Sequence, residues 1–234
     1  MQIRKNLYLV SGGIYGQLGN VWMIPHEKGC VLIDCGSPDS YQTICRNLEY
    51  WGYESTDVTD VLCTHGHDDH AGSAYLFHKN GAKITVGAGD AVMMRRGDLG
   101  EGSPFLNHKM PVCIPDNLIE KDCVINIGDL TIKVITVPGH TDGSVLYYLE
   151  KDDEKWLFTG DMFCCEGEKG DIAVTWWKGD LNYSSEKLGD SFRKLWALNL
   201  EPNVIAGGHN NPRIGEEAKD MIMTAYKYYM LNNR

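Results

Sequence analysis

A stretch that reads THGHDDH, at residues 64–70, constrains the fold of this 234-residue chain more than any other. The residues before it, Val58 to Cys63, predict a buried strand. The residues after it, His70 to Asn80, predict a helix that ends at Gly81. The sequence therefore places four side chains of metal-ligand type where a strand turns into a helix.

The spacing within this stretch suits two ions. Residues two apart in an extended segment face the same way, so His65 and His67 can hold one ion. The turn into the helix redirects Asp69 and His70 toward a second ion, and Gly66 lets the backbone pass close to both. Imidazole with carboxylate suits zinc, with iron or manganese as alternatives. The competing interpretation is a polar helix start whose histidines only cap the backbone.

Three later residues of ligand type each follow a predicted strand and lie beside glycine: His140, Asp161 and His209. A single histidine after a strand is usually structural. Together, however, the three put every remaining ligand candidate at one edge of the predicted sheets. A metal site built from separate loops requires this convergence.

The order of predicted elements favours two β-sheets with helices on their outer faces. Strands are expected at residues 7–10, 21–24, 31–33, 58–63, 83–86, 124–127, 131–137, 145–149, 156–158 and 203–206. Helices are expected from Ser37-Pro38 onward, with Ser37 as the cap, and at residues 70–80, 91–96, 184–198 and 216–231. Residues 97–115 predict a long loop.

The charge balance narrows the expected partners. Lys and Arg total 22 against 32 Asp and Glu, a net charge of −10, so nucleic acid is not expected. No apolar run approaches about 20 residues, so no membrane span is expected. The first ten residues do not resemble a signal peptide, which predicts a cytoplasmic protein.

The eight cysteines include no Cys-x-x-Cys pair. Reduced thiols are therefore expected, in place of disulfides or a zinc ribbon. The adjacent Cys164 and Cys165 are interpreted as buried thiols, with a redox pair as the alternative.

These motifs resemble the metallo-β-lactamase superfamily. The residues that match its His-x-His-x-Asp-His-x-Gly signature, its early Asp-x-Gly turn and its later His, Asp and His elements are His65, His67, Asp69, His70, Gly72, Asp34, Gly36, His140, Asp161 and His209. The resemblance covers most of the chain. It implies an α/β fold, an αββα four-layer sandwich, in a single domain over residues 1–234, with metals at one edge between the sheets.

The resemblance also implies a ligand set and a reaction. The first ion would be bound by His65, His67 and His140, the second by Asp69, His70 and His209, and Asp161 would bridge both. Two divalent ions, zinc before iron or manganese, would share a hydroxide and aim it at an ester, thioester, lactone or amide of a small-molecule substrate. Asp69 would have a catalytic role as well, orienting that nucleophile. Asp34, Thr64 and Thr141 are candidate hydrogen-bond partners of the imidazoles.

Within the superfamily, the glyoxalase II-like hydrolases share this ligand set. Only about 25 residues follow His209, so their glutathione-binding C-terminal region is expected to be absent or very short. Asp161 stands where the main class of zinc β-lactamases places Cys, and no Tyr closely follows it as in the lactonases. The chain thus departs from the typical patterns of both branches, which makes lactam hydrolysis less favoured.

Two other functions are alternatives. Persulfide dioxygenases resemble this chain in length and in residues 138–143 (PGHTDG), and would hold one iron through His65, His140 and Asp161. The other alternative is a catalytically silent binding protein on the same fold. Such proteins usually lose ligands, whereas seven ligand-type residues stand here.

Two segments are candidates for the walls of a substrate pocket. Residues 12–19 carry Tyr15, and residues 163–180 carry Trp176 and Trp177. For the Trp pair, core packing or a contact between copies is the alternative, and a homo-oligomer is left open.

Overall fold

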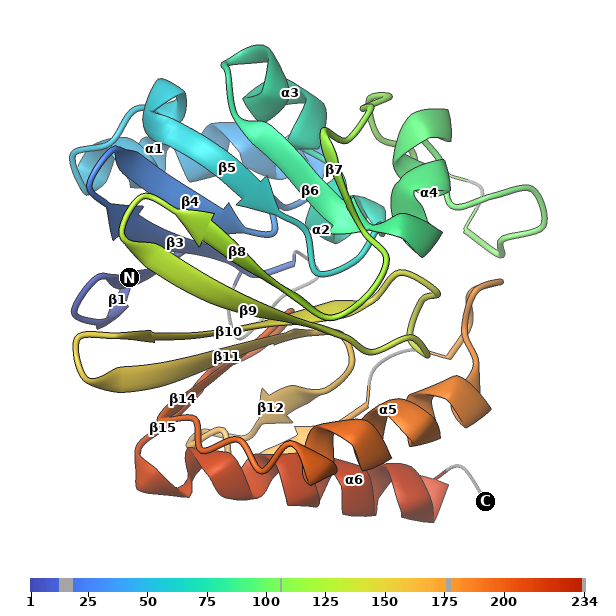
Figure 1. Ribbon diagram of the computed structural model, residues 1–234. Helices are drawn as coiled ribbons and strands as arrows, with labels where there is room; N and C mark the ends of the chain where they lie inside the picture. The colour runs from blue at the N-terminus through green and yellow to red at the C-terminus, as the bar shows by residue number, and fades with distance from the viewer. Residues whose placement is uncertain (13–18, 106, 176–177, 233–234) are drawn as a thin grey trace.

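Two β-sheets pack face to face in the computed structural model, which describes residues 1–12, 19–105, 107–175 and 178–232 (Figure 1). Within these ranges the first sheet has seven strands in sequence order: β1 (Gln2–Arg4), β2 (Leu7–Ser11), β3 (Val21–His26), β4 (Gly29–Ile33), β5 (Val58–Leu62), β6 (Lys83–Gly87) and β7 (Asn117–Ile119). Neighbours from β1 to β4 run antiparallel, and neighbours from β4 to β7 run parallel.

The second sheet runs β15-β14-β11-β10-β9-β8 across its width. Its strands are β8 (Cys123–Ile127), β9 (Leu130–Thr136), β10 (Val145–Lys151), β11 (Glu154–Gly160), β14 (Val204–Gly207) and β15 (Arg213–Ile214), and β12 (Cys164–Glu166) with β13 (Ile172–Val174) forms a separate hairpin. β9, β11 and β14 run in one direction, because β10 is antiparallel to its two neighbours and β14 is parallel to β11. Their carboxyl ends therefore meet at one edge of the sheet.

Helices cover the two outer faces (Figure 1). The first sheet carries α1 (Tyr41–Tyr50), α2 (Asp68–Ala71), α3 (Ala74–Lys79) and α4 (Ala91–Arg96), and the second carries α5 (Ser185–Ala197) and α6 (Asp220–Asn232). Short 3₁₀ turns cover Pro38–Ser40, Ser55–Asp57, Ala88–Asp90 and Glu216–Lys219. The predicted αββα order is confirmed. None of the helices in the described ranges is long and apolar enough to cross a membrane.

Strand β4 shows why the central strands are apolar along their whole length. Cys30 and Leu32 lie in the core beneath the helices of the first sheet, whereas Val31 and Ile33 lie in the core between the two sheets. Successive side chains of a strand point to opposite faces. A strand whose sheet is covered on both sides therefore needs apolar residues at every position.

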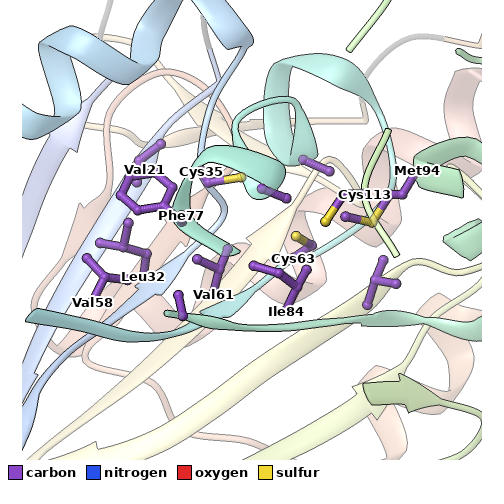
Figure 2. Packing of buried hydrophobic residues seen from close by; sticks show 14 of the residues in the cluster. Val21, Leu32, Cys35, Val58, Val61, Cys63, Phe77, Ile84, Met94 and Cys113 are labelled. Atoms are coloured by element: carbon purple, nitrogen blue, oxygen red, sulfur yellow. The ribbon is translucent and has the colours of Figure 1, made fainter. Parts of the chain in front are cut away.

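The cysteines are free thiols, and six of the eight are buried. Figure 2 shows Cys35, Cys63 and Cys113 among apolar side chains of the core on the helix-covered face of the first sheet. Burial raises the pKa of Cys113 to about 12 and that of Cys165 to about 12, and it also raises the pKa of Cys164. Such thiols are poor nucleophiles. The interpretation of Cys164 and Cys165 as buried thiols is confirmed.

The prediction of one helix over residues 70–80 is wrong, because α2 and α3 are separate. At the break, the Ser73 amide donates to the Gly36 carbonyl at 3.0 Å and the Ser73 hydroxyl donates to the Ser37 carbonyl at 2.7 Å. The carbonyls of the turn after β4 thus accept hydrogen bonds from the residue at which the helix is interrupted. Ser37 does occupy the N-cap position, with Pro38 at the first position as predicted, but of the 3₁₀ turn that leads into α1. Its hydroxyl contacts the Ser40 hydroxyl at 2.9 Å and caps no backbone amide.

Five short strands were not predicted: β1, β7, β12, β13 and β15. Each contains three residues or fewer. A stretch of this length is too short to display the alternation of apolar and polar residues on which strand prediction depends.

Phe192 in α5 provides a test of how the second sheet holds its helices. Its side chain is fully buried and its ring lies 5.7 Å from that of Tyr226 and 5.5 Å from that of Tyr229, both in α6. We expect Phe192→Ala to lower the free energy of unfolding by about 3–5 kcal/mol, because it leaves a cavity between the two helices. Urea denaturation measures this. The control is Trp196→Ala on the same helix, where the side chain is half exposed and the change should stay below about 1 kcal/mol.

Candidate metal centre

All seven ligand-type residues lie at one edge of the two sheets. His65 and His67 lie in the loop after β5, and Asp69 and His70 lie in α2, which follows that loop. The loop after β9 carries His140, β11 is followed by Asp161, and β14 is followed by His209. The carboxyl ends of these strands meet at this edge, so residues up to 140 positions apart come into contact. Six of the seven are buried, and only Asp69 is partly exposed.

A first group contains three imidazoles whose ring nitrogens converge. His65 Nε2 lies 3.1 Å from His67 Nδ1, and His140 Nε2 lies 3.2 Å from the same His67 atom. These three side chains form one of the sets whose ligand atoms all lie within 4.8 Å of one another. Burial, together with neighbouring histidines, lowers the pKa of His65 well below its usual value, and burial lowers the pKa of His140 to about 3. Both imidazoles are therefore neutral at pH 7 and can offer lone pairs to a cation.

A second group combines imidazole and carboxylate. His209 Nε2 lies 3.2 Å from Asp69 Oδ2 and 3.2 Å from His70 Nε2, and His70 Nε2 lies 3.4 Å from the same Asp69 oxygen. Burial opposes protonation of His209, but the Asp161 and Asp69 carboxylates outweigh it and raise its pKa to about 9. The same balance raises the pKa of His70. When no cation is bound, protons on His70 and His209 therefore balance the negative charge of the carboxylates.

Asp161 lies between the two groups. Its Oδ2 is 3.3 Å from His209 Nε2 and 3.7 Å from His140 Nε2, and its Oδ1 is 3.5 Å from His70 Nε2. Burial disfavours its charge, yet the neighbouring histidines hold the pKa of Asp161 well below its usual value. Within the described ranges its buried Oδ1 forms no hydrogen bond. An ionised, buried oxygen without a donor, next to converging ring nitrogens, fits a cation site.

Two of the three predicted partners of the imidazoles contact a histidine of these groups. Asp34 Oδ2 lies 2.9 Å from His70 Nδ1, and its two oxygens accept from the amide and hydroxyl of Thr64 at 2.6 and 2.8 Å. The Thr64 hydroxyl also lies 3.1 Å from His65 Nδ1. Thr141 is placed differently, because its hydroxyl donates to Asp90 at 2.6 Å.

Sequence reasoning missed two polar residues that hold the groups in place. Asp180 Oδ2 lies 3.0 Å from His67 Nε2, which leaves Nδ1 of that ring for the first group. Asn20 donates its side-chain amide to the carbonyls of Gly207 and Asn210, at 3.1 and 3.0 Å, on both sides of His209. Neither residue belongs to a motif, so the sequence carries no signal for them.

The predicted pocket segments are only partly described. Tyr15, Trp176 and Trp177 lie outside the described residues. The described end of the first segment, Gly19, packs against the second group, and a Cβ there would lie 2.3 Å from the Asp69 carbonyl.

The long loop at residues 97–115 also reaches the motif. His108 in this loop lies 2.9 Å, through its Nδ1, from Asp68 Oδ1. Asp68 is the neighbour of Asp69 in the motif, so this loop forms part of the surroundings of the second group.

Comparison with known proteins agrees with this fold and identifies the family. The model of the family described as "Metallo-beta-lactamase superfamily" matches residues 14–209. The chain therefore belongs to the metallo-β-lactamase superfamily, as the sequence motifs predicted.

Several relatives have names that state an activity. The hydroxyacylglutathione hydrolase of Prochlorococcus marinus is 28% identical over 204 residues, covering 80% of this chain and 71% of that protein. The human acyl-coenzyme A thioesterase MBLAC2 is 27% identical over 176 residues, covering 63% of this chain and 59% of that protein. Metallo-beta-lactamase domain-containing protein 1 of Xenopus laevis is 28% identical over 204 residues, covering 87% of this chain and 75% of that protein. The expected enzyme class, a metallo-hydrolase of the glyoxalase II-like branch, is confirmed.

Solved structures support the fold alone. A metallo-β-lactamase of Cronobacter sakazakii has a TM-score of 0.72 at 20% identity, covering 89% of this chain and 79% of that chain. The class B3 di-zinc metallo-β-lactamase LRA-12, from an Alaskan soil metagenome, has a TM-score of 0.73 at 23% identity, covering 100% of this chain and 93% of that chain.

The pKa differences predict that zinc binding releases protons at the second group and none from His65 and His140 of the first. Zinc must displace the proton of His209, whose pKa is about 9, and that of His70, whose pKa is also raised, so affinity at this group should fall at least about tenfold for each pH unit below 9. His140, with a pKa of about 3, carries no proton to displace. Calorimetric titration at pH 7 in buffers of different ionisation enthalpy measures the released protons. His140→Ala isolates the second group, and zinc uptake by this variant without proton release would contradict the assignment.

Proposed function

We propose that this chain is a hydrolase that holds two divalent cations, zinc first with iron or manganese as alternatives, and cleaves an ester, thioester, lactone or amide bond of a small molecule. The observation that carries the proposal is the pairing of two adjoining groups through Asp161. The first cation would be held by His65, His67 and His140, and the second by Asp69, His70 and His209. We also propose that residues 1–234 act as a single domain.

The cations, when bound, would lower the pKa of a water molecule and polarise the bond to be cleaved. The chain itself supplies orientation and a place for protons. Asp34, Thr64 and Asp180 fix the imidazoles through hydrogen bonds, so that the ring nitrogens keep their spacing. Asp69 is the one member of the two groups whose side chain is partly exposed, at 28%. It is therefore the group placed to orient water and to accept its proton.

Thioesters are the first substrate class to test. Two relatives carry names of enzymes that act on thioesters, a coenzyme A ester in one case and a glutathione ester in the other. The match covers only 59% of the human relative. We therefore propose a thioester bond for this chain and not the coenzyme A part of that relative's substrate.

The persulfide dioxygenase alternative needs only one iron. A single iron held by His65, His140 and Asp161 would leave the second group without a cation, and the convergence of that group here supports the hydrolase. Elemental analysis combined with an oxygen electrode separates the two. One iron per chain with oxygen consumption on a glutathione persulfide would replace the hydrolase proposal. A chain that takes up no metal would instead support the catalytically silent binding protein.

We expect Asp161→Ala to remove metal and activity together, because both groups lose their shared carboxylate. His67→Ala should do the same through the first group. Metal content after dialysis, measured by atomic emission, is compared with thioester turnover in the same samples. Asp153→Ala, in the β10–β11 turn, is the control and should retain both. Full metal content in either site variant would refute the ligand assignment.

Asp69→Asn separates proton transfer from metal binding. The amide keeps an oxygen that can serve as a ligand, but it cannot accept a proton at neutral pH. We expect kcat to fall on the order of 10²–10⁴-fold while KM changes little. Steady-state kinetics on metal-loaded protein, with metal content measured alongside, test this. An unchanged kcat at full metal loading would remove Asp69 from the catalytic role.

A further inference from the structure

Asp90 belongs to neither group, yet its carboxylate joins two of the loops that carry the first one. It closes the 3₁₀ turn after β6 and is fully buried. Its Oδ2 accepts from the Gly66 amide at 2.8 Å and from the Thr141 hydroxyl at 2.6 Å. Its Oδ1 accepts from the Gly143 amide at 2.8 Å. All three partners are donors, so the ionised carboxylate matches its surroundings.

Two of these donors lie next to imidazoles of the first group in the sequence. Gly66 separates His65 from His67, in the loop that follows the first sheet's β5. Thr141 directly follows His140, in the loop that follows the second sheet's β9. The first group therefore draws its imidazoles from two different sheets, and one buried carboxylate holds both source loops.

Close backbone packing leaves little room for these loops to shift. A Cβ on Gly87 would lie 1.8 Å from the Gly143 carbonyl oxygen, and a Cβ on Gly143 would lie 2.5 Å from the Asp90 amide nitrogen. A Cβ on Gly66 would lie 2.8 Å from Asp90 Cβ. Glycine on both loops thus brings the backbone against Asp90, and the carboxylate then fixes the direction of each loop.

We propose that Asp90 is the positioning residue of the first group, setting the spacing of its three imidazole nitrogens and hence its affinity for a divalent cation. The inference rests on the proposed function only in requiring that this group binds a cation. The effect of Asp90 should be confined to the first group, because the turn that carries His209 is held by Asn20 instead. Losing the Asp90 carboxylate should therefore weaken the first cation site and spare the second.

Two contacts between β10 and the residues that follow β5 do not involve Asp90, so we expect the variant to fold. The Val145 amide donates to the Thr64 carbonyl at 2.8 Å, and the Tyr147 hydroxyl donates to the Cys63 carbonyl at 2.9 Å. Asp90→Asn preserves shape but turns an amide NH₂ toward at least one donor, so it disturbs the loops without removing volume.

The experiment is a zinc titration of the metal-free protein in competition with a chromophoric chelator. His140→Ala and His209→Ala identify which binding step belongs to which group. In Asp90→Asn we expect the step that His140→Ala abolishes to weaken by about 10–100-fold, and the other step to change less than about twofold. Circular dichroism checks the fold. Thr141→Val, which removes one donor only, should weaken the same step by a smaller factor and decides the matter if Asp90→Asn does not fold.

Asp116→Asn is the matched control. Asp116 also accepts from a backbone amide, that of Ile84 at 2.7 Å, but near the opposite end of β6 from Asp90. It should leave both steps unchanged. Two normal zinc steps in Asp90→Asn and Thr141→Val would overturn this inference and leave the proposed function standing. A wild-type chain without a zinc step would overturn both, and equal weakening of both steps would show that Asp90 acts on the whole edge.

Discussion

The structure depends on keeping titratable side chains together where water is excluded. Burying unpaired imidazoles and carboxylates costs free energy unless positive charge or hydrogen bonds compensate. Here six such side chains are buried at one sheet edge, with ring nitrogens 3.1–3.2 Å apart in the first group. In the four-layer architecture, strands from both sheets end at the same edge. The buried polar groups therefore lie next to one another and can compensate one another's charge and hydrogen-bonding needs.

The two groups avoid uncompensated buried charge in different ways. The first contains only imidazoles, and burial keeps His65 and His140 uncharged at neutral pH. The second contains Asp69, and its carboxylate with that of Asp161 keeps His209 protonated up to a pKa of about 9. If the two groups bind cations as proposed, a cation at the first would meet uncharged His65 and His140, whereas a cation at the second would have to compete with protons. The two adjoining groups are thus chemically distinct.

Much of this could be predicted from the sequence, for identifiable reasons. Apolar strands such as β4 and β14 can be recognised from their composition, and the 64–70 motif can be recognised from its spacing. The break at Gly72 and Ser73 could not be predicted, since it depends on carbonyls of the distant turn after β4. Asp180, Asn20 and Asp90 were missed for the same reason, because their roles come from partners that only tertiary contact supplies.

The separation of the ligands along the chain has a consequence for biosynthesis. His67 and His140 are 73 residues apart, whereas His70 and His209 are 139 residues apart. On the ribosome, every imidazole of the first group has been added well before His209 exists. The three imidazoles of the first group are therefore all present in the growing chain 69 residues before the second group gains its last member.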